Sequence, residues 1–122
     1  MKWKEVLARR SYIFVMKTYT VNKDKQQSID ITHSGEYQIN LIGEGAQVKI
    51  FGSFLAQNKE SVDISVVIHH KAKNTVANTI LKGVARDASS IKFVGRIIID
   101  EECGNSNSFL TQRILLLSDS AH

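Results

Sequence analysis

One short pattern occurs twice in this chain, and the repetition restricts the fold more than any other feature of the sequence. Residues 48–54 align without gaps on residues 91–97, at an offset of 43 positions. Gly52 falls on Gly95, and most of the remaining pairs are apolar in both copies. Since both copies are rich in strand-forming residues, the repetition is typical of a stacked β architecture.

Alternation of apolar and polar residues continues from Tyr12 to the C-terminal end, which is the signature of β-strands. The alternating sets are Tyr12, Phe14 and Met16; Ile29 and Ile31; Tyr37, Ile39 and Leu41; Val48, Ile50 and Phe54; Val62, Ile64, Val66 and Ile68; Val76 and Ile80; Ile91, Phe93, Ile97 and Ile99; and Phe109 with residues 114–117. Turn-type stretches separate the sets at residues 22–27, 43–45, 57–60, 86–90 and 101–107. No helix-length pattern lies between the strands, so alternating βαβ units are excluded.

Two all-β arrangements fit these runs. An antiparallel sandwich or barrel commonly uses two-residue Asn-Gly or Asp-Gly turns, and the chain contains neither dipeptide. A parallel β-helix repeats at one rung or a whole multiple of it, and the 43-residue offset suits two rungs of about 21 residues. The sequence therefore favours a short parallel β-helix in which Gly52 and Gly95 mark stacked bends. A short helix over residues 2–10 is also expected.

Composition sets broad limits on what the protein can be. A chain of 122 residues, 43% apolar and 23% charged, is expected to form one folded domain. Its longest apolar runs are far shorter than the roughly 20 residues that span a bilayer, so no membrane association is expected. A single cysteine, Cys103, excludes an internal disulfide and fits a cytoplasmic location.

Positive charge is concentrated at the N-terminal end. Residues 1–25 sum to +5, whereas residues 26–122 sum to −1. We therefore expect a basic arm or cap over residues 1–25 and a β-helical core over residues 26–122. Because a basic arm on a neutral body is weak evidence for polyanion binding, no nucleic-acid partner is expected.

An ordered set of short motifs between about residue 36 and residue 122 carries a family likeness. The set comprises residues 41–46, Gly52, residues 54–56, Asp63, His70, Asn74, Thr75, Asn78, Lys82, Gly83, residues 93–97, residues 115–119 and Ala121. In order and spacing these motifs resemble the SufB/SufD family, whose members are scaffold components for iron–sulfur cluster assembly. The resemblance implies a right-handed parallel β-helix in a cytosolic complex. In that complex SufB- and SufD-type subunits pair through their β-helices, together with an ABC-type ATPase of the SufC kind.

The chain departs from the family pattern in several places. Lys73 stands where a proline is usual, and Ala77 stands where a serine is common. In full-length members, a segment with the cysteine and histidine tied to cluster assembly follows the part matched here, and a helical region that docks the ATPase comes after it. Neither role is expected to carry over to residues of this chain, which is interpreted as a naturally minimal homologue or an excised core.

His70 and Cys103 are weak candidates for binding metal. His69 and His70 are adjacent in a strand, so their side chains point to opposite faces and cannot chelate one ion together. His70 continues the inward set of its strand and matches the family's histidine, and a hydrogen-bonded role at a rung corner is the main expectation. Cys103 lies in an acidic turn and does not match the family's functional cysteine. An iron–sulfur cluster is therefore expected only within a complex.

The candidate interface is the apolar run Ile114, Leu115, Leu116 and Leu117. It is expected to form a final strand with only five residues after it, which leaves an apolar edge uncovered. Either a SufB/SufD-type subunit or a second copy of the chain covers this edge, or the tail folds back over it.

These observations favour a non-catalytic scaffold of SUF-type iron–sulfur cluster assembly that acts through subunit pairing. The alternative is a stand-alone β-helical interaction domain without cluster-assembly activity. The sequence contains no Cys-x-x-Cys, His-Glu-x-x-His or phosphate-binding glycine motif, and its one acidic cluster, residues 100–102, lies in a turn. A polysaccharide-cleaving enzyme with a catalytic carboxylate pair is therefore disfavoured, and no catalytic residue is expected.

Overall fold

The computed structural model describes residues 14–122, so the helix predicted over residues 2–10 lies outside the described part of the chain. Residues 14–122 contain eight β-strands and no helix. The strands are β1 (Phe14–Val21), β2 (Gln26–Ile31), β3 (Ser34–Leu41), β4 (Gln47–Ala56), β5 (Ser61–His70), β6 (Val76–Ala85), β7 (Ser90–Ile99) and β8 (Asn107–Leu116). Strand β1 falls within residues 1–25, the segment expected to form a basic arm or cap.

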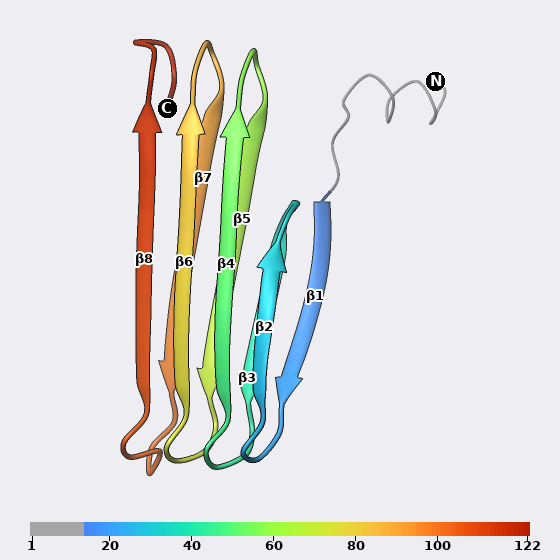
Figure 1. The fold of residues 1–122 in the computed structure, drawn as a ribbon, viewed down its shortest axis with the longest axis vertical. Coiled ribbons are helices and arrows are strands. Elements are labelled where there is room, and N and C mark those ends of the chain that lie inside the picture. Colours follow the sequence, from blue (N-terminus) through green and yellow to red (C-terminus); the bar gives the residue numbers. More distant parts are fainter. Residues whose placement is uncertain (1–13) are drawn as a thin grey trace, which may run out of the picture.

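The strands form two four-stranded parallel sheets (Figure 1). Sheet A has the order β1-β3-β5-β7 and sheet B has the order β2-β4-β6-β8, so the chain alternates between the sheets. Each odd-numbered strand and the even-numbered strand after it make one rung, and β1 and β8 lie at opposite ends of the stack (Figure 1). Every strand pair is parallel, which excludes the antiparallel alternative for residues 14–122 and is consistent with the predicted parallel β-helix.

The apolar core lies between the inner faces of the two sheets. Alternate residues of each strand point inward, and those of the middle rungs are almost completely buried. Ile39 and Ile68 from sheet A belong to the same buried cluster as Ile50 and Leu81 from sheet B. The alternation in the sequence therefore reflects one inner face per sheet, as predicted.

The 43-residue repeat does not mark two stacked rungs, and this prediction was wrong. The register between stacked strands advances by 20 or 21 residues in the first step and by 29 to 31 residues in later steps. Gly52 lies in sheet B beside Leu81, whereas Gly95 lies in sheet A beside Val66. The two copies resemble each other because strands of both sheets bury one face against the same core and need the same alternation.

The true rung spacing appears in the turns that lead from sheet A to sheet B. Asp24, Gly45, Asn74 and Asn105 all have positive φ, and they are 21, 29 and 31 residues apart. Asn, Asp and Gly tolerate this left-handed conformation better than other residues do. At Gly45, φ is 80° and an added Cβ atom would require the carboxylate of Asp24 to move, so glycine is favoured there.

The C-terminal residues fold back over one corner of the last rung. Ala121 is buried in a small apolar cluster there. The backbone N–H of His122 donates to the oxygen of Ser89 (3.1 Å), and the N–H of Ile91 donates to the oxygen of His122 (2.8 Å). This is the pattern of a parallel bridge beside Ser90, so His122 extends sheet A at the start of β7.

Candidate functional site

The candidate interface lies on the last rung, where no further rung of residues 14–122 covers the core. In sheet A, Ile68 of β5 and Ile97 of β7 are register partners that both point inward. Ile68 is 1% exposed, whereas Ile97 is 40% exposed. Ile99 pairs with the fully buried His70, yet it too is exposed. Ile97 and Ile99 therefore occupy inward positions that are buried in the neighbouring strand β5, but in β7 these positions are exposed.

Sheet B shows the same change at its last strand. Ile114 and Leu116 pair with buried residues of β6, yet they are 40% and 49% exposed. Leu115 points instead to the outer face of the sheet, and Leu117 follows the end of β8; both are exposed. All four predicted interface residues are thus accessible, but only Ile114 and Leu116 belong to the open core. Their role in an interface stays a prediction.

Both strands of the last rung also have a backbone edge that faces no neighbouring strand in the described chain. β7 pairs with β5 alone, and β8 pairs with β6 alone. His122 occupies the β7 edge beside Ser90. Unpaired N–H and C=O groups along such edges favour pairing with an added strand. The open core and the open edges therefore form one surface that is suited to association.

His70 is buried at the end of β5, and His69 points to the opposite face, as the sequence predicts. Nδ1 of His70 lies 2.7 Å from Oγ1 of Thr75, whereas Nε2 is buried and has no hydrogen-bond partner. Burial lowers the pKa of His70 below its usual value, and the neighbouring His69 lowers this pKa further. The expectation of a hydrogen-bonded corner residue is confirmed.

A buried polar network links His70 to the next turn of the stack. Thr75 is fully buried, and its Oγ1 lies 2.9 Å from Oγ of Ser106. The Ser106 hydroxyl also donates to the backbone oxygen of Ala72 (3.1 Å). Two stacked turns are therefore tied together by short polar side chains. The sequence analysis missed Thr75 and Ser106 in this role, although their spacing of 31 residues matches that of the corner residues Asn74 and Asn105.

The structure does not gather the weak metal candidates into a metal site. Cys103 lies partly buried in the turn after β7. Nε2 of His69 lies 2.6 Å from Oδ1 of Asp100, a pair that the sequence analysis did not identify. Within residues 14–122, no group of three or more His, Cys, Asp or Glu side chains could hold a metal ion.

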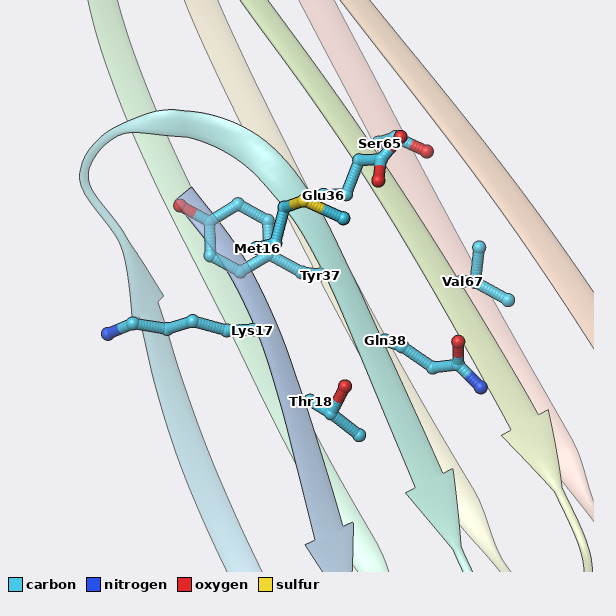
Figure 2. A pocket seen from close by; sticks show the side chains of 8 residues that line it. All are labelled: Met16, Lys17, Thr18, Glu36, Tyr37, Gln38, Ser65 and Val67. Carbon is cyan, nitrogen blue, oxygen red and sulfur yellow. The ribbon is translucent and has the colours of Figure 1, made fainter. Parts of the chain in front are cut away.

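A shallow pocket of about 280 Å³ lies on the outer face of sheet A (Figure 2). Met16, Glu36 and Ser65 form one row across β1, β3 and β5. The lining residues are Met16, Lys17, Thr18, Glu36, Tyr37, Gln38, Ser65 and Val67. They include one carboxylate and neither histidine nor cysteine, so the lining offers no set of several metal-binding side chains.

Comparison with known protein families determines the family to which this chain belongs. The family model described as "SUF system FeS cluster assembly, SufBD core domain" matches residues 15–122, which is most of the chain. The chain belongs to the SufBD core-domain family. The resemblance seen in the sequence motifs is thereby confirmed, and it places the chain in SUF-type iron–sulfur cluster assembly. Comparison with curated proteins and with solved structures gives no match.

The SufBD match spans the polar corner and the open end of the core alike. Hydrogen bonds join His70 to Thr75 and Thr75 to Ser106, and they stabilise stacked turns. The inward apolar side chains of β7 and β8, in contrast, are exposed at the end of the described stack. None of the described residues belongs to a helix long and apolar enough to cross a membrane. The open end is therefore the feature of this SufBD domain that best supports a function.

Proposed function

We propose that this SufBD core domain is a non-catalytic scaffold component of cytoplasmic SUF-type iron–sulfur cluster assembly. It acts by pairing with a SufB- or SufD-type subunit, or with a second copy of itself, through the last rung. In this proposal the domain is a short right-handed parallel β-helix, which the alternation of the chain between two parallel sheets supports. The observation that carries the proposal is the open end of the core on β7 and β8.

Pairing at this end buries apolar surface that the fold leaves uncovered. Ile97, Ile99, Ile114 and Leu116 are 40–49% exposed although they point into the core. Full burial of a side chain of this size contributes about 1.5–3 kcal/mol, so covering these four contributes roughly 3–5 kcal/mol before the cost of association. This gain is moderate, and strand pairing along the free edges of β7 and β8 is expected to add to it.

The iron–sulfur cluster is cargo of the assembled complex in this proposal. His70 and Cys103 each lack a surrounding ligand set in the described chain, so a partner would supply the remaining ligands. An ABC-type ATPase of the SufC kind is the further partner that the family relationship suggests.

Affinity capture of co-expressed SufB- and SufD-type subunits tests the pairing. The double variant Ile114→Glu with Leu116→Glu is expected to abolish the complex, because an unpaired carboxylate buried in an apolar interface is costly. Met16→Glu is the matched control, since Met16 is an exposed apolar residue of β1 at the other end of the stack. A complex that survives the double variant, or no association with either subunit or with a second copy, would contradict the proposal.

Anaerobic reconstitution with iron and sulfide, read by visible absorbance, tests the role in cluster assembly. Cluster absorbance that requires the partner and persists in Cys103→Ala supports the scaffold. A stable complex that forms no cluster favours the alternative, a stand-alone interaction domain.

A further inference from the structure

Two cations lie side by side on the outer face of sheet B, one of them on β8, the last strand. Lys82 of β6 and Arg113 of β8 are register partners, and both are exposed. Neighbouring strands are about 4.8 Å apart, and like charges directly opposite each other destabilise a sheet. Neither side chain has an ion-pair partner among residues 14–122. This pairing of like charges does not stabilise the fold.

An apolar row flanks the two cations on one side: Leu55, Val84 and Leu115 lie next to each other across β4, β6 and β8. The row on the other side is mixed, with Phe51, Ile80 and the polar Thr111. Leu55, Leu115 and Phe51 are all exposed. Residues two apart in a strand are about 7 Å apart, so the row of Val84 and Leu115 lies roughly 7 Å from the cations.

A groove of about 690 Å³ runs over this part of the sheet. It is lined by Ser53, Phe54, Lys82, Gly83, Val84, Gln112, Arg113, Ile114 and Leu115. The charged outward side chains of sheet B are Lys49, Lys82 and Arg113 against one carboxylate, Asp30 of β2. Lys82 and Arg113 therefore line one side of the groove, and the apolar residues Val84 and Leu115 line the other.

We propose that this groove binds an acidic amphipathic helix of a partner protein. Helix side chains at i and i+4 are about 5–6 Å apart, which is close to the spacing of Lys82 and Arg113 on neighbouring strands. Two carboxylates four residues apart therefore meet both cations when the helix axis runs across the strands. A helix of about 10 Å diameter that lies along this groove places its acidic face on the cations and its apolar face on Val84 and Leu115. A nucleic acid matches the charge, but its bases bind mainly by stacking on aromatic side chains, and the row of Leu55, Val84 and Leu115 is aliphatic.

Titration with a synthetic probe tests the proposal. The probe is a fluorescent peptide of about four helical turns, with two glutamates four positions apart between flanking leucines. Lys82→Glu with Arg113→Glu is expected to weaken its binding about tenfold or more, and Leu115→Ser about threefold. Lys92→Glu with Arg96→Glu makes the same charge change on sheet A and should alter the affinity by less than about twofold. Amide resonances that shift on binding should lie in β4, β6 and β8.

Several results would overturn the assignment. These are equal affinity for a peptide with glutamines in place of the glutamates, no binding at about 1 mM peptide, and equal losses in the sheet A control. Tighter binding of single-stranded oligothymidine, lost in the same Lys82 and Arg113 variant, would assign the groove to nucleic acid instead. Thermal melts confirm that each variant is folded. The variant Ile97→Glu with Ile99→Glu alters the open core at residues that do not line the groove, so it should disrupt subunit pairing and leave peptide binding intact, which separates failure of one proposal from failure of the other.

Discussion

Two neighbouring rungs of this domain have matching inward side chains in very different environments. The rung of β5 and β6 has a neighbour on each side, whereas the rung of β7 and β8 has one within the described chain. Ile68 is buried, and its register partner Ile97 is 40% exposed. The comparison shows that burial in this fold depends on the next rung as much as on the strand itself.

Among the variants considered, truncation of these two isoleucines should show the largest difference in stability loss between the two rungs. Ile68→Ala should lower the free energy of unfolding by about 3–4 kcal/mol, because it leaves a cavity in a closed core. Ile97→Ala should lower it by about 1 kcal/mol, because much of that side chain is already in contact with water. Urea unfolding followed by circular dichroism measures both losses, and equal losses would contradict an open last rung.

Substitutions of two glycines compare an inner turn with the turn of the last rung. Gly45→Ala should lower the free energy of unfolding by about 1–2 kcal/mol, because φ is positive there and alanine is strained in that conformation. Gly104, in the turn of the last rung, has no atom within 4 Å of an added Cβ. Gly104→Ala should therefore change stability by less than about 0.5 kcal/mol. A similar loss for both variants in thermal melts would argue against tightly stacked inner turns.

Acid titration tests the closed environment of the corner between β5 and β6. Because burial lowers the pKa of His70 in the folded state, the unfolded chain, with an ordinary histidine pKa of about 6.5, takes up a proton first as the pH falls. Stability is therefore lost below about pH 6.5, until folded His70 itself titrates. His70→Leu should remove this part of the acid sensitivity. Thermal melts over a pH series measure the effect.

The exposed His33 provides the control for that series, since His33→Gln should keep the acid sensitivity of the parent protein. At neutral pH, His70→Leu should cost about 1 kcal/mol or less, because it removes the hydrogen bond to Thr75 together with an unpaired buried nitrogen. An unchanged pH dependence in His70→Leu would show that other groups control acid unfolding.

The smallest expected changes in stability come from charge reversals on the outer faces of the two sheets. Lys82→Glu places opposite charges side by side with Arg113 and should raise the free energy of unfolding by about 0.5–1 kcal/mol. Lys92→Glu, whose register partner is Asp63, should lower it by a similar amount. Chemical denaturation at low salt measures both changes. Destabilisation by Lys82→Glu would contradict the unfavourable pairing of cations on sheet B.

The strands could be predicted from the sequence because apolar alternation directly reflects burial against a core. The sets at Tyr37 to Leu41 and Val62 to Ile68 fall within β3 and β5. The rung length could not be predicted in the same way, because both sheets impose the same alternation and strands from different sheets look alike. The left-handed turn positions, among them Asn74 and Asn105, carry the correct spacing.

The candidate site was predictable only in part. An apolar run at Ile114 to Leu117 is visible in the sequence, but which of its members face the open core depends on the register with β6. The contact of His69 with Asp100 and that of Thr75 with Ser106 each join residues 31 positions apart. Such contacts follow from the rung length, so a wrong rung length conceals them.

Hydrogen–deuterium exchange of the domain alone and with a SufB- or SufD-type subunit tests most directly whether the last rung is an open end that a partner covers. In the isolated domain, amides of β7 and β8 should exchange faster than those of β5 and β6, because their rung is covered on one side only. In the complex, protection of β7 and β8 should rise about tenfold or more, while β3 and β4 change little. Equal protection of the two rungs in the isolated domain, or unchanged protection in the complex, would contradict the account.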